Sequence, residues 1–156
     1  MTVVRKLRTI RSLGPARRGV LAEALVLPLS IGISFWVVGV PRTQALLRRL
    51  ARSGRPPSVD SAYIEESIRL GNWAQRLVRR RTGIGGSCLV RSLTLWSILL
   101  RRGVETDLRV GFRRAEGNIE GHAWLEREGR ILNEREDVAR TYVTAEGPMR
   151  FDVRWR

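Results

Sequence analysis

The sequence is short of the residue types that build disulfides and metal sites. It has one cysteine, Cys88, and one histidine, His122, and Lys6 is the only lysine among its 29 basic residues. A single cysteine excludes a disulfide within the chain, so nothing in the sequence requires an oxidising compartment. One cysteine and one histidine cannot complete a metal site, so we expect no metal and no cofactor.

Negative charge is also scarce. Asp and Glu number 15, which leaves a formal net charge of +14. This charge is nearly all arginine, spread along the chain with short runs at 79–81, 101–102 and 113–114. Such a charge can attract nucleic acid, anionic lipid or an acidic partner. No nucleic-acid motif accompanies it, so we expect a solvated arginine-rich surface and no nucleic-acid partner.

The length of 156 residues and the hydrophobic content of 43% are typical of a single globular domain. Within it, residues 1–58 form a basic and apolar helical segment that ends in the linker 53–58, Ser-Gly-Arg-Pro-Pro-Ser. Residues 59–156 form the core that carries the candidate site. The basic N-terminus lacks a small-residue cleavage site, so we expect no signal peptide and a cytoplasmic protein.

An uncharged stretch, residues 24–40, lies inside an apolar block that covers residues 20–52. Pro28, Gly32 and Gly39 interrupt it, and its length is borderline for a spanning helix. We expect a broken, buried helix that packs on the domain or on a partner. Membrane insertion and peripheral membrane attachment are the alternatives.

The periodicity of the remaining chain predicts helices followed by strands, which is an α+β order. Helical spacing indicates one helix from residue 60 or 61 to about 81, and a second over 88–102 that Gly103 stops. Alternation indicates strands at 108–113, 121–126 and 130–134, with a loop at 114–120. Shorter strands are expected at 142–143 and 149–155.

Cys88 follows the glycine-rich loop 83–87 and begins the second helix. The positive end of a helix favours a thiolate, and the Cys88 amide is a candidate oxyanion donor. His122 begins a strand and can serve as the base for this nucleophile. The alternatives are a buried structural cysteine and a strand histidine packed beside Trp124.

The third candidate is Glu134, whose position depends on a turn. A three-residue turn at 127–129, with Gly129 in the left-handed conformation, would pair His122 directly with Glu134 on one face of the sheet. A two-residue turn would shift the register by one and place Glu134 on the other face. Asn133 and Asp137 are the fallback candidates for this position.

Several motifs at characteristic spacing resemble lasso peptide biosynthesis proteins, which are transglutaminase-like cysteine peptidases. The matching segments are 88–93 (Cys-Leu-Val-Arg-Ser-Leu), 99–103, 108–111, 121–126 (Gly-His-Ala-Trp-Leu-Glu), 129 and 132–134. The resemblance implies a papain/transglutaminase-like core, with the catalytic cysteine at a helix start packed on a small antiparallel sheet. It implies a triad of Cys88, His122 and Glu134, although the family usually has Asp at the third position.

The resemblance also implies a role. Such peptidases remove the leader from a lasso precursor peptide. Because residues 1–58 do not resemble the leader-recognition module that some members carry, we expect a standalone peptidase half. Its partners would be the precursor, a separate leader-binding protein and an ATP-dependent cyclase. Two alternatives remain open at this point: a transglutaminase-like acyltransferase or amidase, and a non-catalytic, basic, membrane-peripheral scaffold.

Overall fold

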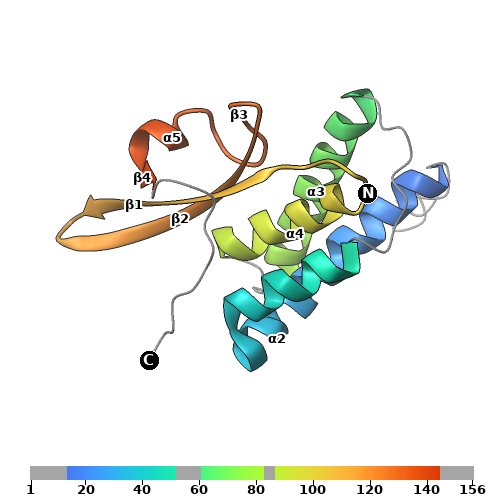
Figure 1. Ribbon diagram of the computed structural model, residues 1–156, viewed down its shortest axis with the longest axis horizontal. Coiled ribbons are helices and arrows are strands. Elements are labelled where there is room, and N and C mark those ends of the chain that lie inside the picture. Colours follow the sequence, from blue (N-terminus) through green and yellow to red (C-terminus); the bar gives the residue numbers. More distant parts are fainter. Residues whose placement is uncertain (1–13, 52–60, 83–86, 145–156) are drawn as a thin grey trace.

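The computed structural model describes residues 14–51, 61–82 and 87–144 (Figure 1). Its elements follow in the order α2 (Pro15–Ala51), α3 (Ser61–Thr82), α4 (Cys88–Leu100), β1 (Asp107–Ala115), β2 (Asn118–Arg127), β3 (Arg130–Ile131), α5 (Val138–Thr141) and β4 (Val143–Thr144). The strands form an antiparallel sheet with the order β3-β2-β1-β4. The predicted α+β fold is therefore confirmed.

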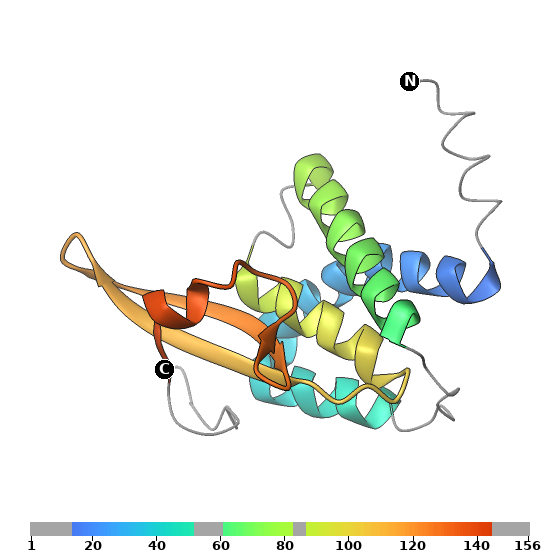
Figure 2. The ribbon, with the colours of Figure 1, turned by 90° about the horizontal axis from the view of Figure 1, so that it is seen from above.

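The sheet and the long helices meet at α4. This helix contacts α2 and α3 as well as β1 and β2, and Figures 1 and 2 show it between the helices and the sheet. All its residues from Ser92 to Leu99 are buried. The predicted stripe of leucines therefore extends round the whole helix, because each side of α4 faces another element. The core around α4 contains Ile31, Leu47, Ile64, Ile68, Leu93, Leu99, Leu108 and Leu125.

α2 is the broken helix that the sequence predicts. Gly39 has non-helical dihedral angles, with φ 78° and ψ 170°, and Pro28 and Pro41 lie within the element. The freed Gly39 carbonyl accepts a hydrogen bond of 2.8 Å from Thr43 Oγ1. The expected burial holds for one face only, because Trp36 on the outer face is 90% exposed.

Among the described residues, one helical stretch, Arg17–Ala51, is long and apolar enough to cross a membrane. A core helix of a soluble protein can share this length and composition. Here the inner face of α2 supplies Ile31 and Leu47 to the core that it shares with α3 and α4. The predicted linker 53–58 and the predicted strand at 149–155 lie outside the described residues.

The expected loop at 114–120 is wrong. β1 and β2 continue through most of this segment and pair until Ala115 meets Asn118. The two residues between them, Glu116 and Gly117, have φ of 48° and 84°. A tight turn with two positive φ values matches the twist of a hairpin, so Glu-Gly closes it without a longer loop.

The predicted three-residue turn at 127–129 is also wrong. Arg127 pairs with Arg130 and Glu126 pairs with Ile131, so the turn consists of Glu128 and Gly129 alone. Both have positive φ, 52° and 77°. The strand expected at 130–134 ends at Ile131. At the C-terminal side, the strand expected at 142–143 is β4, which starts one residue later.

Candidate active site

Cys88 is the first residue of α4 and is partly buried. Ser87 precedes it in an extended conformation, with φ −67° and ψ 130°, and the Ser87 carbonyl accepts the first helical hydrogen bond from the Arg91 amide at 3.2 Å. The first-turn amides of a helix have no partner within the helix. The thiol therefore lies where backbone N–H groups and the helix dipole favour negative charge.

His122 lies on β2 and packs against two aromatic rings. The centroid of its ring is 5.1 Å from that of Tyr142, at an interplanar angle of 24°, and 6.4 Å from that of Trp124. The residue opposite His122 on β1 is Gly111. A Cβ atom there would lie 2.7 Å from Tyr142 Cβ and 2.9 Å from Trp124 Cη2. The missing side chain at Gly111 is thus what makes room for the rings that hold the imidazole.

Glu134 lies beside His122, although not through the predicted pairing. Its Oε1 atom is 3.4 Å from His122 Nε2. β3 ends at Ile131, so strand register no longer decides on which side of the sheet Glu134 lies. The chain bends after β3, and this bend places the Glu134 carboxylate beside the His122 ring.

Asn133, the first fallback candidate, connects this bend to the sheet and to α4 through hydrogen bonds. Its Oδ1 accepts a hydrogen bond of 2.8 Å from the Leu125 amide, and its Nδ2 donates one of 2.9 Å to Ser92 Oγ. Ser92 Oγ in turn donates to the Ala123 carbonyl at 3.0 Å. Asn133 therefore contacts β2 and α4, and Glu134 is the residue that lies beside His122.

Asp137, the second fallback candidate, is an exposed residue before α5. Its carboxylate pairs with Arg135 at 3.7 Å. Of the three candidates for the third position, Glu134, Asn133 and Asp137, it is Glu134 that lies beside the His122 ring. Within the described part of the chain, an ion-pair contact joins His122 to Glu134.

Arg91 is a site residue that the sequence prediction missed. Its Nη2 forms an ion pair with Glu134 Oε1, the same oxygen that lies beside His122. A signal was present, because Arg91 follows Cys88 by three residues and such residues share one side of a helix. The arginine thus links the helix that begins with Cys88 to the acid beside His122.

Burial and positive charge shape the electrostatics of this group. Burial is the main cause that lowers the pKa of His122, and the charges of Arg91 and Arg113 lower it further. Burial also lowers the pKa of Arg91, which a negative charge on Cys88 would raise again. A lowered pKa favours the neutral form of the imidazole, which is the form that a general base requires.

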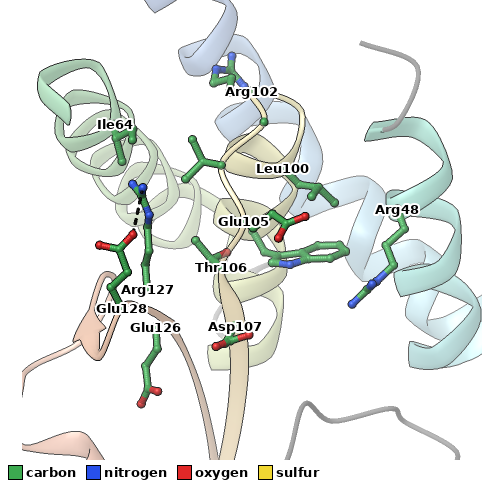
Figure 3. A pocket seen from close by; sticks show the side chains of 13 residues that line it. Arg48, Ile64, Leu100, Arg102, Glu105, Thr106, Asp107, Glu126, Arg127 and Glu128 are labelled. Carbon is green, nitrogen blue, oxygen red and sulfur yellow. Dashed lines mark ion pairs between the residues drawn. The ribbon is translucent and has the colours of Figure 1, made fainter. Parts of the chain in front are cut away.

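A polar pocket of about 850 Å³ lies at the opposite end of α4 and is lined by residues that include Arg48, Trp96, Leu100 and Glu126 (Figure 3). An ion pair of 3.5 Å joins Arg127 to Glu128 at its edge. Arg48 stacks over Trp96 at 5.2 Å. Because Cys88 begins α4 and the pocket is lined by Trp96 and Leu100 near the other end of the helix, the pocket is separate from the candidate site.

Within the described residues, no cluster of three or more His, Cys, Asp or Glu side chains could hold a metal ion. A thiol at a helix start, an imidazole and a carboxylate are the groups that a cysteine nucleophile site uses.

Comparison with known proteins identifies the family of the chain. A family model described as the transglutaminase-like superfamily matches residues 31–146. Comparison with the curated proteins and with the solved structures gives no match. Members of this superfamily are usually enzymes with a catalytic cysteine. Because the match covers well over half of the 156 residues, the chain belongs to the transglutaminase-like superfamily.

Proposed function

We propose that this protein is a cysteine peptidase that cuts the leader from a lasso precursor peptide, with Cys88 as nucleophile, His122 as base and Glu134 as the acid that orients His122. The observation that carries the peptidase chemistry is the contact of 3.4 Å between His122 Nε2 and Glu134 Oε1. Arg91, on the first turn of the Cys88 helix, contacts the same carboxylate.

The orientation of the imidazole assigns its two nitrogens. In this proposal Nε2, which lies 3.4 Å from Glu134 Oε1, carries the imidazole hydrogen, and the lone pair on Nδ1 is available to the Cys88 thiol. Nδ1 takes the thiol proton as sulfur attacks the scissile carbonyl carbon. The tetrahedral oxyanion is stabilised by the free amides at the start of α4.

The second half of the reaction returns the enzyme to its starting state. The protonated His122 gives its proton to the departing amine when the C–N bond breaks, which leaves a thioester on Cys88. Water, deprotonated by Nδ1, then attacks the thioester and releases the carboxylate of the leader. The free amine belongs to the core peptide and becomes available for ring closure by a cyclase.

The choice of a leader peptide as substrate is supported by the resemblance of residues 88–93 and 121–126 to lasso peptide biosynthesis proteins. The outer face of α2 offers a surface for the leader-binding protein. It carries an apolar stripe, Val26, Leu29, Ile33, Trp36 and Val37, and every side chain of the stripe is exposed. An exposed apolar stripe of this kind usually marks an interaction site. A cytoplasmic location is part of this proposal.

The test is to incubate the protein with a lasso precursor peptide and a leader-binding protein, and to follow the products by mass spectrometry. The expected products are intact leader and intact core, and Cys88→Ala should give neither. Addition of hydroxylamine distinguishes the acyltransferase alternative, because an enzyme that prefers amine acceptors would give mainly the leader hydroxamate. An intact precursor after long incubation with both proteins would contradict the leader-peptidase proposal.

A further inference from the structure

Among the described residues, part of the outer edge of β2 has no partner strand beside the candidate site. On one side β2 pairs with β1 from Asn118 to Glu126, which is all of the strand but its last residue. On the other side, β3 pairs only with Glu126 and Arg127. Among the described residues, the stretch of β2 from Asn118 to Gly121 has no partner strand on this outer side.

Strand geometry identifies which backbone groups point outward from this edge. The Leu125 carbonyl accepts from the Leu132 amide, and the Leu125 amide donates to Asn133, so both Leu125 groups face away from β1. The Ala123 carbonyl faces the same way and accepts from Ser92 Oγ. Because orientation alternates along a strand, the N–H and C=O groups of Gly121 and Ile119 also point outward.

These groups lie near the start of α4. α4 and β2 run side by side in the same direction, with the β1–β2 turn extending past the first turn of α4 (Figures 1 and 2). Ser92 contacts β2 at Ala123. Cys88 precedes Ser92 by four residues, which is about 6 Å along a helix and about two residues along a strand. The thiol end of α4 is therefore level with Gly121.

We propose that the edge of β2 at Ile119 and Gly121 binds the main chain of the peptide substrate as an added strand and leads the scissile bond to Cys88. The proposal rests on the peptidase function proposed above and assigns the substrate class as an extended, unfolded peptide segment. The occupant follows from position, because an edge strand that ends beside the nucleophile and His122 is suited to present a peptide carbonyl to them.

Two further features fit an added strand. Gly121 has no side chain, so a peptide can approach its backbone closely. Ile119 is 75% exposed and Phe112 is 45% exposed, and both lie on the face of the sheet opposite to His122. Side chains of the added strand that fall on this face would contact them, while the alternate side chains would lie toward His122.

The decisive experiment uses the Cys88→Ala protein and a labelled synthetic peptide that spans the cut site of a lasso precursor. Copies of the peptide carry a single backbone N-methyl group at successive positions. Affinity, measured by fluorescence anisotropy, should fall about fivefold or more at every second position and stay near the unmodified value between them, because only alternate amides face β2. The neighbouring positions of the same peptide are the matched control.

A second variant tests the protein side of the same contact. Ile119→Pro removes the outward N–H and leaves the pairing with β1 intact, because proline is tolerated on an open edge. We expect peptide affinity to fall at least about fivefold. The alkylation rate of Cys88 by iodoacetamide and the thermal melting curve report whether the Ile119→Pro protein, with its native Cys88, is folded.

The outcomes separate this inference from the proposed function. Alternating losses of affinity support the added strand, even if the wild-type protein fails to cleave the unmodified peptide and the peptidase proposal falls. Cleavage with equal tolerance of N-methylation at all positions would overturn the edge site and leave the peptidase proposal standing. A dimer in sedimentation that Ile119→Pro abolishes would also overturn it, because a second copy would then occupy the edge.

Discussion

His122 and Glu134 meet through atoms Nε2 and Oε1 at 3.4 Å, across a bend of the chain and not across a strand ladder. The same Glu134 oxygen is contacted by Arg91 from α4. One carboxylate thus connects the strand that carries the imidazole with the helix that begins with the thiol. This arrangement has consequences for chemistry and for stability that can be measured separately.

Cys88→Ala should abolish precursor cleavage and leave the melting temperature nearly unchanged, because it removes the nucleophile but alters only one small, partly buried side chain. Iodoacetamide should inactivate the wild-type protein in step with the labelling of this single thiol, which mass spectrometry can count. Cleavage by the alanine variant at near the wild-type rate would remove Cys88 from the mechanism.

Glu134→Gln should lower kcat by about a hundredfold with little change in KM, because it removes the charge that orients and stabilises protonated His122. Asp137→Asn is the matched control, since Asp137 pairs with Arg135 away from the ring. Steady-state kinetics of precursor cleavage give both constants. If the control variant were the damaged one and Glu134→Gln were mild, Glu134 would not be the orienting acid.

Arg91→Gln should raise the pKa of His122 toward its ordinary value. The positive charge of Arg91 disfavours the imidazolium ion, so its removal makes protonation easier and moves the acid limb of the rate profile to higher pH. Burial, which is the larger cause of the lowered pKa, remains, so the rise should be partial. NMR titration of the imidazole is direct, because the chain has one histidine.

Arg91→Lys is the control for this titration. It keeps the positive charge near His122 and should leave the pKa closer to the wild-type value. A pKa that stays unchanged or falls in Arg91→Gln would show that the charge of Arg91 has no influence on the ring.

Gly111→Ala should destabilise the protein by about 1–3 kcal/mol, because the new Cβ would overlap Tyr142 and Trp124. It should also slow cleavage by displacing Tyr142 from the His122 ring. Gly19→Ala is the matched control: a Cβ there meets nothing closer than Arg102 Nη2 at 3.8 Å, and alanine favours the helix. Urea unfolding of both variants is the measurement, and equal stability of the two would contradict the packing argument.

Trp36→Glu should weaken cleavage that depends on the leader-binding protein without slowing the alkylation of Cys88. Trp36 is 90% exposed on α2, so the change costs little in folding but places a charge on the apolar stripe. Leu46→Glu, at 49% exposure, should behave similarly if the docking surface extends past the kink.

Leu47→Glu serves as the contrasting control, because Leu47 is 6% exposed and a buried charge should unfold the protein. Equal loss of cleavage and of alkylation in a folded Trp36→Glu protein would tie the stripe to the active site itself. A wild-type protein that needs detergent for extraction would favour membrane attachment of α2 instead.

The sequence alone determined the elements whose cause is local. The helical spacing of leucines after Cys88 was sufficient to place α4, although the helix ends at Leu100 and not at the predicted residue 102 before Gly103. The alternation of Leu108, Val110 and Phe112 was sufficient to place β1. Gly39 and the nearby prolines indicated a break in α2, because these residues disturb helical hydrogen bonding wherever they occur.

The two turns show where local signals were insufficient. Glu116-Gly117 and Glu128-Gly129 both adopt positive φ. Glutamate is not a typical residue for the first of these positions, so composition suggested longer loops in both places. Pairing of the strands on either side of each turn stabilises the glutamate in this conformation. The sequence of the turn alone does not reveal this stabilisation.

The group around His122 was decided only by tertiary structure. The sequence favoured Glu134 only through an assumed turn, with Asn133 and Asp137 as fallback candidates. The Asn133 side chain forms hydrogen bonds with Leu125 and Ser92. These bonds fix the bend so that Glu134 lies toward the His122 ring. Arg91 then meets the carboxylate because α4 packs on β2, and that packing arises from burial of side chains contributed by every element of the core.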